Sequence, residues 1–180
     1  ELTALDGVTG GERLQSDIKM ILNLAGNCLI NQHGDINRTA EILRDTSKCE
    51  FIVCSDLFMT ASAKFADVLL PGVSMFEGEN ITQPWQYGDF VGFNNQVIEP
   101  MYEGRFEYDW LSEVAEKIGL GPQFTEGRTL GQWLEWCYED LRRKEPELPD
   151  YGTFKKAGIW RYKNTPVRIA FADQRRDIAQ

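Results

Sequence analysis

The chain has 180 residues, of which 42% are hydrophobic and 12% aromatic, and this suits an ordinary globular domain with a real core. Its formal net charge of -9 repels nucleic acid and anionic lipid, so we expect neither as a partner. No run is long and apolar enough to cross a membrane, and the N-terminus lacks a basic and then apolar signal region. We therefore expect no direct membrane insertion.

The cysteines and the histidine do not follow a metal-binding pattern. The four cysteines are Cys28, Cys49, Cys54 and Cys137, and no two of them have C-x-x-C spacing, so we expect no zinc or iron–sulfur site within this segment. The single histidine, His33, cannot supply a cluster of ligands, and a Ser/His/Asp site would depend on it alone. We interpret it as a loop histidine.

The first half of the chain alternates between strand-like and helix-like segments. Residues 1–16 are Gly-rich and aperiodic, which indicates a loop. Residues 18–24 are mostly apolar and end at Gly26 and Asn27, which predicts a buried strand of a parallel sheet. The following elements are predicted as a helix over 36–47 capped by Asp35, a buried strand over 49–56, a short helix over 61–66 capped by Thr60, and a strand over 67–71.

The remainder is predicted to be scaffold. Helices are expected over 110–119 and over 129–144, the second with a Thr129…Gln132 capping box and with Trp133 and Cys137 in the core. Residues 145–164 are punctuated by proline and glycine and indicate a loop, and 165–180 are expected to lead toward a next domain. The aromatic residues Trp85, Tyr87 and Phe90 are interpreted as an exposed interface.

The order strand, helix, strand, helix, strand predicts an α/β fold. We expect a Rossmann-like parallel sheet flanked by helices in three αβα layers, with an added helical and loop part at the C-terminus. Ligands of such sheets bind beyond the carboxyl ends of the strands, here at Gly26-Asn27-Cys28 and at Ser55-Asp56. Asp56 can accept from a ribose or a guanine there, and N–H groups after Gly26 can face a pyrophosphate.

Two alternatives stay open at this stage. Asp56 or Thr60 can simply cap the next helix, as polar turn residues do in any α/β domain. A conventional NAD-binding half is disfavoured because Gly26 is followed by "NCLIN", so the G-x-G-x-x-G fingerprint is absent.

Several separated motifs resemble one family in the same order. They are "LAGNCLINQHGDINRT", "FIVCSDLFMTASAKFADVLLP", "FEGEN" and "YDWLSEVAEKIGL". Together they are similar to the molybdopterin oxidoreductases of the dimethyl sulfoxide reductase family. The resemblance implies a large enzyme whose molybdenum is held by two molybdopterin guanine dinucleotides (MGD), one in each of two related α/β domains. Residues 17–125 resemble one such nucleotide-binding domain, and 126–180 are expected to be its extension.

The resemblance also implies which residues touch the cofactor. These are Gly26, Asn27, Ser55, Asp56 and Asp109. Asn27 offers a donor and an acceptor, and an ionised Asp56 or Asp109 can accept from the N1–H and amino group of guanine. Asp109 can equally cap the helix that follows it, and one residue can do both.

The sequence departs from the family pattern at two positions. Cys28 stands where proline is usual, which is expected to loosen the turn, and Gly78 stands where some members have a cofactor-binding lysine. Asp67 is interpreted as the end of the short helix or a turn cap, outside the site.

The resemblance assigns no catalytic residue and no molybdenum ligand to this segment, and it places an iron–sulfur cluster elsewhere in the parent chain. It implies a parent enzyme that reduces S-oxides or N-oxides in anaerobic respiration, works with electron-transfer and membrane-anchor subunits, and is exported to the periplasmic or outer face of the membrane. The alternative is a non-catalytic scaffold domain of the same fold that has lost cofactor binding.

Overall fold

The computed structural model describes residues 18–32, 34–84, 88–163 and 171. The predictions for residues 1–16, for His33, Trp85 and Tyr87, and for nearly all of 165–180 lie outside these residues. The chain divides into two compact units, which are described separately below. Unit 1 comprises 1–79 and 96–133, and unit 2 comprises 80–95 and 134–180.

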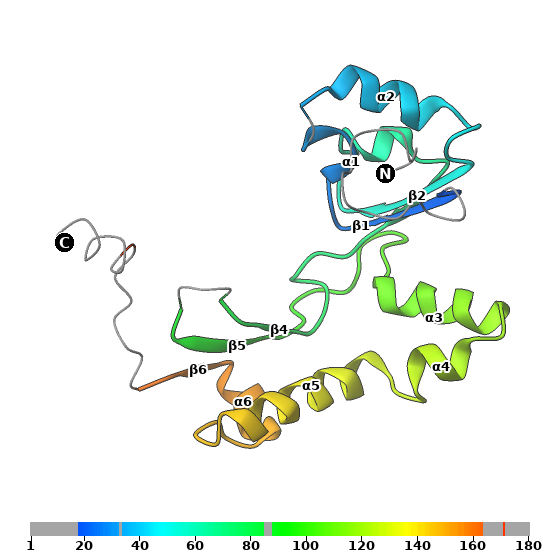
Figure 1. The fold of residues 1–180 in the computed structure, drawn as a ribbon. Coiled ribbons are helices and arrows are strands. Elements are labelled where there is room, and N and C mark those ends of the chain that lie inside the picture. Colours follow the sequence, from blue (N-terminus) through cyan, green and yellow to red (C-terminus); the bar gives the residue numbers. More distant parts are fainter. Residues whose placement is uncertain (1–17, 33, 85–87, 164–170, 172–180) are drawn as a thin grey trace. The chain divides into compact units, whose positions relative to one another are not determined.

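Unit 1 is built on a parallel sheet with the strand order β1-β2-β3. The strands are β1 (Met20–Leu24), β2 (Phe51–Asp56) and β3 (Val68–Pro71). Helices α1 (Cys28–Asn31) and α2 (Ile36–Arg44) follow β1 and lie on the same side of the sheet (Figure 1). The predicted α/β class, with a parallel sheet and flanking helices, is confirmed.

One face of this sheet carries the core of unit 1. Ile52 and Cys54 of β2 pack there against Leu43 of α2, Cys49 and Ala63. The helix begins where the sequence predicts, because the carboxylate of Asp35 accepts a hydrogen bond from the backbone N–H of Arg38 at 3.0 Å.

The opposite face of the sheet carries exposed apolar side chains. They are Met20, Leu22 and Leu24 of β1 with Phe51 and Val68 from the neighbouring strands. The prediction of a buried first strand is therefore wrong. β1 is an edge strand, and α1 and α2 pack only on the face that holds Ile21 and Ile52. On the same face Val53 and Ser55 are nevertheless buried, and the Ser55 hydroxyl donates to the carboxylate of Glu107.

The second crossover is shorter than the sequence pattern suggested. The helix predicted over 61–66 is a single 3-10 turn, η1 (Ala63–Phe65). Thr60 caps it as predicted, since its hydroxyl accepts from the N–H of Ala63 at 3.2 Å. The helix cannot lengthen because Asp67 already pairs with Ile52 of β2: its N–H donates to the Ile52 carbonyl, and its carboxylate accepts from the Ile52 N–H, both at 2.8 Å. Asp67 thus joins two strands and does not cap a turn.

Two further helices complete unit 1. They are α3 (Glu107–Lys117) and α4 (Gly121–Thr125). Helix α3 begins three residues earlier than predicted, with Phe106 at its N-cap, so Asp109 lies inside the first turn and is not the cap. Trp110 and Ala115 of α3 are buried, whereas Val114 and Ile118 are exposed.

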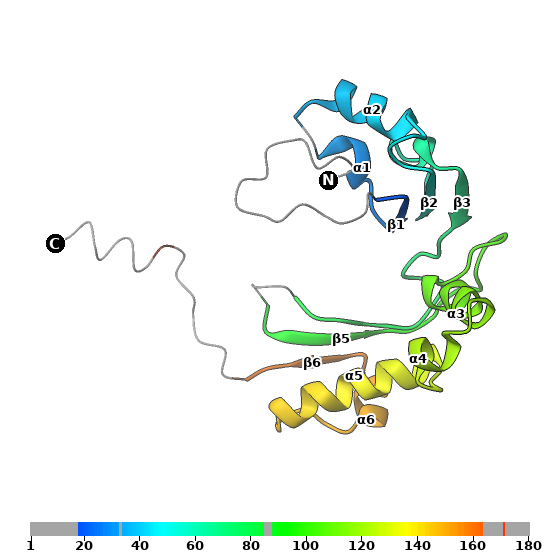
Figure 2. The same cartoon turned by 45° about the vertical axis from the view of Figure 1, so that its right-hand side comes forward.

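Unit 2 is an antiparallel sheet packed against helices. The sequence patterns did not indicate this sheet. Strands β4 (Asn80–Thr82), β5 (Phe90–Asn94) and β6 (Ile159–Arg161) pair in that order. Helix α5 (Leu130–Lys144) and helix α6 (Tyr151–Ala157) lie on one side of β5 and β6 (Figure 2). The segment 145–164, predicted as a loop, therefore contains α6 and β6.

The core of unit 2 corrects the prediction for α5. The buried side chain of α5 is Tyr138, which stacks on Phe154 with ring centroids 4.3 Å apart, while Cys137 is exposed. Phe90, predicted to be exposed, is half-buried. Among the residues with described structure, no helix has the length and apolar character needed to span a bilayer.

Candidate functional site

The carboxyl ends of β1 and β2 lie side by side. Leu24 pairs with Ser55, and the N–H of Ala25 donates to the Ser55 carbonyl at 2.8 Å. Ala25 turns the chain away from the sheet with a φ of 48°, in the left-handed region. The structure thus brings Gly26, Asn27, Ser55 and Asp56 together at one sheet edge, where parallel sheets bind their ligands.

The turn after β1 is held by a side chain that sequence analysis missed. Asn23 is buried, and its amide donates to the carbonyl of Gly26 while its oxygen accepts from the Cys28 thiol at 3.2 Å. Cys28 was expected to loosen the turn because it replaces proline. Its thiol instead ties the start of α1 back to β1. The sequence signal for Asn23 is a polar residue inside the mostly apolar run 18–24, because a polar side chain that a strand buries needs a hydrogen-bond partner.

Asn27 is oriented from the second crossover. Its side-chain oxygen accepts from the N–H of Ser62 at 3.0 Å, and the hydroxyl of the fully buried Ser62 accepts from the N–H of Leu29 at 3.0 Å. These bonds fix the Asn27 carbonyl oxygen, and they use one backbone N–H that was expected to face a pyrophosphate. The Asn27 amide N–H groups donate to none of the described residues, so they remain for a ligand.

Asp56 serves the turn after β2 and stays half-buried. One oxygen accepts from the N–H of Leu57 at 2.7 Å, and the other accepts from the Thr60 hydroxyl at 3.3 Å. Asp56 therefore has the turn-capping role that the sequence left open. These two hydrogen bonds use only two of the roughly four acceptor positions of the carboxylate, so it can accept further hydrogen bonds.

Ser55 and Cys54, by contrast, are fully buried. The Ser55 hydroxyl donates to the carboxylate of Glu107 at 2.9 Å, which joins the end of β2 to the start of α3. Burial raises the pKa of the Cys54 thiol, so the thiolate that would act as a nucleophile or metal ligand is disfavoured. Among the described residues, no group of three or more His, Cys, Asp and Glu side chains is arranged to hold a metal ion.

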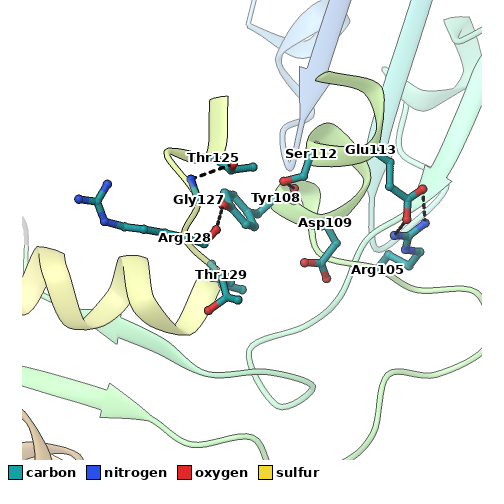
Figure 3. Close-up of a pocket in the computed structure, with 10 residues that line it drawn as sticks. Arg105, Tyr108, Asp109, Ser112, Glu113, Thr125, Gly127, Arg128 and Thr129 are labelled. Atoms are coloured by element: carbon teal, nitrogen blue, oxygen red, sulfur yellow. Dashed lines mark hydrogen bonds and ion pairs between the residues drawn. The ribbon is translucent and has the colours of Figure 1, made fainter. Parts of the chain in front are cut away.

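Asp109 faces a different part of unit 1. It lines an open groove of about 540 Å³ between α3 and residues 125–130 (Figure 3). The groove is framed by an ion pair between Arg105 and Glu113 at 2.6 Å and by a hydrogen bond from the Tyr108 hydroxyl to the Arg128 carbonyl. None of the four residues at the strand ends lines this groove.

The "FEGEN" segment stabilises unit 1 through hydrogen bonds to Glu77 and through close packing at Gly78. Glu77 is 3% exposed, and its carboxylate accepts from the N–H groups of Ser74 and Met101, each at 2.6 Å. Hydrogen bonds from Ser74 and then from Met101 lower the pKa of Glu77 below its usual range. Gly78 is buried, and a Cβ there would lie 1.7 Å from Cζ of Phe106. A lysine side chain at 78 would therefore require Phe106 to move.

A parallel α/β sheet with polar side chains at its carboxyl edge defines a class of ligand-binding domain. The molybdopterin oxidoreductase family model matches residues 6–117, more than half of the chain, so the chain belongs to that family.

The chain is also similar to particular proteins. It is 48% identical to the dimethyl sulfoxide reductase DmsA of Escherichia coli (strain K12), over 91% of this chain and 20% of the relative. It is 30% identical to the dimethyl sulfoxide/trimethylamine N-oxide reductase of Rhodobacter capsulatus, over 79% of this chain and 18% of the relative. Among solved structures, acetylene hydratase from Pelobacter acetylenicus matches with a TM-score of 0.61 and 25% identity, over 81% of this chain and 18% of that one. The chain thus spans about a fifth of the length of these relatives.

Proposed function

We propose that this chain binds one molybdopterin guanine dinucleotide as part of a larger molybdenum oxidoreductase. The observation that carries the proposal is the junction of the β1 and β2 carboxyl ends, where Gly26, Asn27, Ser55 and Asp56 lie together. The molybdenum–pterin group supplies the redox chemistry when it is bound. The residues of this chain bind and orient its nucleotide end, and none of them is assigned as a molybdenum ligand.

The chemistry of the residues fits the nucleoside better than the phosphates. Asn27 supplies amide donors and Asp56 supplies carboxylate oxygens, whereas none of the four strand-end residues is a cation. Guanine presents N1–H and an amino group, which an ionised carboxylate can accept. Asp109 is the fifth residue of the proposal. Its carboxylate accepts no hydrogen bond from the described residues, and its groove would receive a part of the dinucleotide other than the base.

The extent of the nucleotide-binding region is part of the same proposal. We assign residues 17–125 to it and 126–180 to its extension. Unit 1 supports this assignment over most of its length, since it contains the sheet, the strand ends and α3. Residues 80–95 belong by packing to unit 2, with the extension.

Isothermal titration of the chain with GDP and with AMP tests the proposal. We expect GDP to bind more tightly than AMP, and Asp56→Asn to weaken GDP binding. Asp35→Asn is the matched control, because it makes the same chemical change in unit 1 and asparagine caps a helix as well as aspartate. Equal binding of the two nucleotides, or equal effects of the two variants, would refute the site.

For the protein to which the chain belongs, we propose reduction of S-oxides or N-oxides in anaerobic respiration. The names of the relatives support this. That protein would carry two MGD groups on molybdenum and an iron–sulfur cluster outside this segment. It would work with electron-transfer and membrane-anchor subunits on the periplasmic or outer face of the membrane. Oxidation of a reduced dye by dimethyl sulfoxide tests the activity: the full-length protein should catalyse it and the chain alone should not.

A scaffold domain that has lost its cofactor is the second candidate function. Phe106 fills the space beside Gly78, where some relatives carry a cofactor-binding lysine, and this observation favours it. The titration above separates the two functions, since a scaffold would show no preference for GDP.

A further inference from the structure

Two of the four cysteines lie against one asparagine near the carboxyl edge of the unit 1 sheet. Asn23 of β1 pairs in register with Cys54 of β2, so their side chains lie on the same face of the sheet. The thiol of Cys28, the first residue of α1, donates to Oδ1 of Asn23 at 3.2 Å. Asn23 also forms a hydrogen bond with the Cys54 thiol. Both thiols therefore contact the same side chain.

The two thiols also affect each other electrostatically. Burial raises the pKa of Cys54, the hydrogen bond with Asn23 lowers it, and the charges of Asp56 and Cys28 raise it. A charge shifts the pKa of another group only when the two lie close together. Cys28 and Cys54 are therefore neighbours in the fold, although α1 and α2 separate them in the sequence.

Only one of the two thiols is accessible to a dissolved reagent. Cys28 is exposed, whereas Cys54 has 0% exposure and its thiol donates to the carbonyl of Ser62 at 3.9 Å. None of the four described residues of α1 is buried, so the start of this helix can turn toward β2 without opening the core. A reagent can thus react with Cys28 first, and Cys54 can react only with a modified Cys28.

The other two cysteines lie elsewhere and provide matched controls. Cys49 is buried, and its thiol donates to the carbonyls of Lys19 and Phe51 at 3.8 and 3.7 Å, at the opposite end of β1 and β2. Cys137 is exposed and belongs to unit 2. The chain thus offers one buried and one exposed cysteine outside the pair.

We propose that Cys28 and Cys54 form an oxidisable dithiol, which a small-molecule disulfide such as oxidised glutathione converts into a disulfide bond between α1 and β2. The Cys28 thiolate attacks one sulfur of oxidised glutathione, and one glutathione thiolate leaves. The Cys54 thiolate then attacks the Cys28 sulfur of this mixed disulfide, and the second glutathione thiolate leaves. Two cysteine thiols are oxidised, oxidised glutathione is reduced, and the two cysteine protons pass to the glutathione thiolates. The second step is the slower one, because burial disfavours the Cys54 thiolate.

The disulfide would change the edge of the sheet where the candidate site lies. Cys28 directly follows Asn27, and Cys54 directly precedes Ser55. Because the Cys28 thiol would no longer donate to Asn23, the turn after β1 would lose one of its hydrogen bonds. The redox state of the dithiol would therefore alter both segments of the site, whichever ligand binds there.

Oxidation followed by peptide mapping tests the proposal. The folded chain is incubated with oxidised glutathione, its remaining thiols are alkylated, and it is cut after glutamate without reduction. Cleavage after Glu41 and Glu50 leaves the three cysteines of unit 1 on different peptides, so mass spectrometry identifies each pair. We expect the chain to lose the mass of two hydrogen atoms and to give one linked peptide pair, which joins Cys28 to Cys54.

Single serine variants assign the two steps. Cys28→Ser should abolish the linked peptides and leave Cys54 unmodified, because the oxidant cannot reach it. Cys54→Ser should instead accumulate glutathione on Cys28. Cys49→Ser and Cys137→Ser should leave the Cys28–Cys54 link unchanged. The map of the unaltered chain decides the question even if Cys54→Ser fails to fold.

The same oxidation in concentrated urea shows whether the fold selects the pair. In the unfolded chain the shortest loop is favoured, so Cys49 and Cys54 should be linked most often. The proposal is wrong if the folded chain gives the same mixture of pairs as the unfolded chain. It is also wrong if glutathione stays on Cys28 of the unaltered chain while Cys54 remains a free thiol. Neither result depends on nucleotide binding, so the proposed function is tested separately.

Discussion

One methyl group at Gly78 tests the packing that positions α3. An added Cβ would lie 1.7, 2.5 and 2.8 Å from three ring carbons of Phe106. Ordinary contacts between carbon atoms are about 3.5–4.0 Å, so the ring must move by roughly 2 Å or the backbone must shift. The φ of Gly78 lies outside the left-handed region, so the conflict is one of space and not of backbone conformation. Gly78→Ala therefore overpacks a buried site.

The expected cost is about 1–3 kcal/mol of unfolding free energy, the usual range for overpacking. It is offset by about 0.4–1 kcal/mol, since alanine reduces the conformational entropy of the unfolded chain. Urea denaturation followed by circular dichroism measures the net loss of stability. Gly131→Ala is the matched control, because a Cβ at that position of α5 meets nothing within 4 Å. It should stabilise the chain by about 0.4–1 kcal/mol.

A double-mutant cycle shows whether the ring is the cause. In a Phe106→Ala background the space beside Gly78 is empty, so Gly78→Ala should become neutral or stabilising there. If Gly78→Ala costs the same in both backgrounds, or costs nothing in the unaltered chain, the account of this junction is wrong.

Three further substitutions probe other contacts. Glu77, whose pKa is lowered in the fold, should contribute stability that is complete above its unfolded pKa near 4.5 and is lost as the pH falls through the lower folded value. Urea titrations from pH 7 to pH 3 should therefore be flatter for Glu77→Gln. Burial raises the pKa of Tyr138 to about 12, so its contribution should hold below pH 10 and fall as the pH rises toward 12. Tyr138→Phe should remove this alkaline loss and, since the Pro149 carbonyl loses its donor, cost about 1–3 kcal/mol at pH 7. Asp35→Ala should cost about 0.5–2 kcal/mol by removing the cap of α2, and a melting curve unchanged by this substitution would contradict that role.

Local sequence patterns were sufficient to predict an element where that element is defined by its own residues. The three strands of unit 1, the Asp35 cap and the Thr129…Gln132 capping box are all present, the last with hydrogen bonds of 2.8 and 3.3 Å. Apolar runs, polar caps and turn residues are local signals, and they also placed Asn27 and Ser55 at the sheet edge.

The errors arose where distant residues decide the outcome. The 61–66 helix is cut short because Asp67 pairs with Ile52 of another strand. The antiparallel sheet of unit 2 joins β5 to β6, which lie more than 60 positions apart, and no local pattern shows that pairing. Ser55 and Glu107 are 52 positions apart in the sequence and come into contact only in the folded chain. Contacts of this kind depend on the whole fold.

The most direct test of the central claim is to locate guanine nucleotide binding on the isotope-labelled chain by NMR. Titration with GDP, with AMP as the control, should shift the backbone resonances of Asn27, Ser55, Asp56 and Glu107 together, and the shifts should be weaker with Asp56→Asn. Shifts that are the same for both nucleotides, or that fall only on residues away from the β1 and β2 carboxyl ends, would contradict the site proposed for this chain.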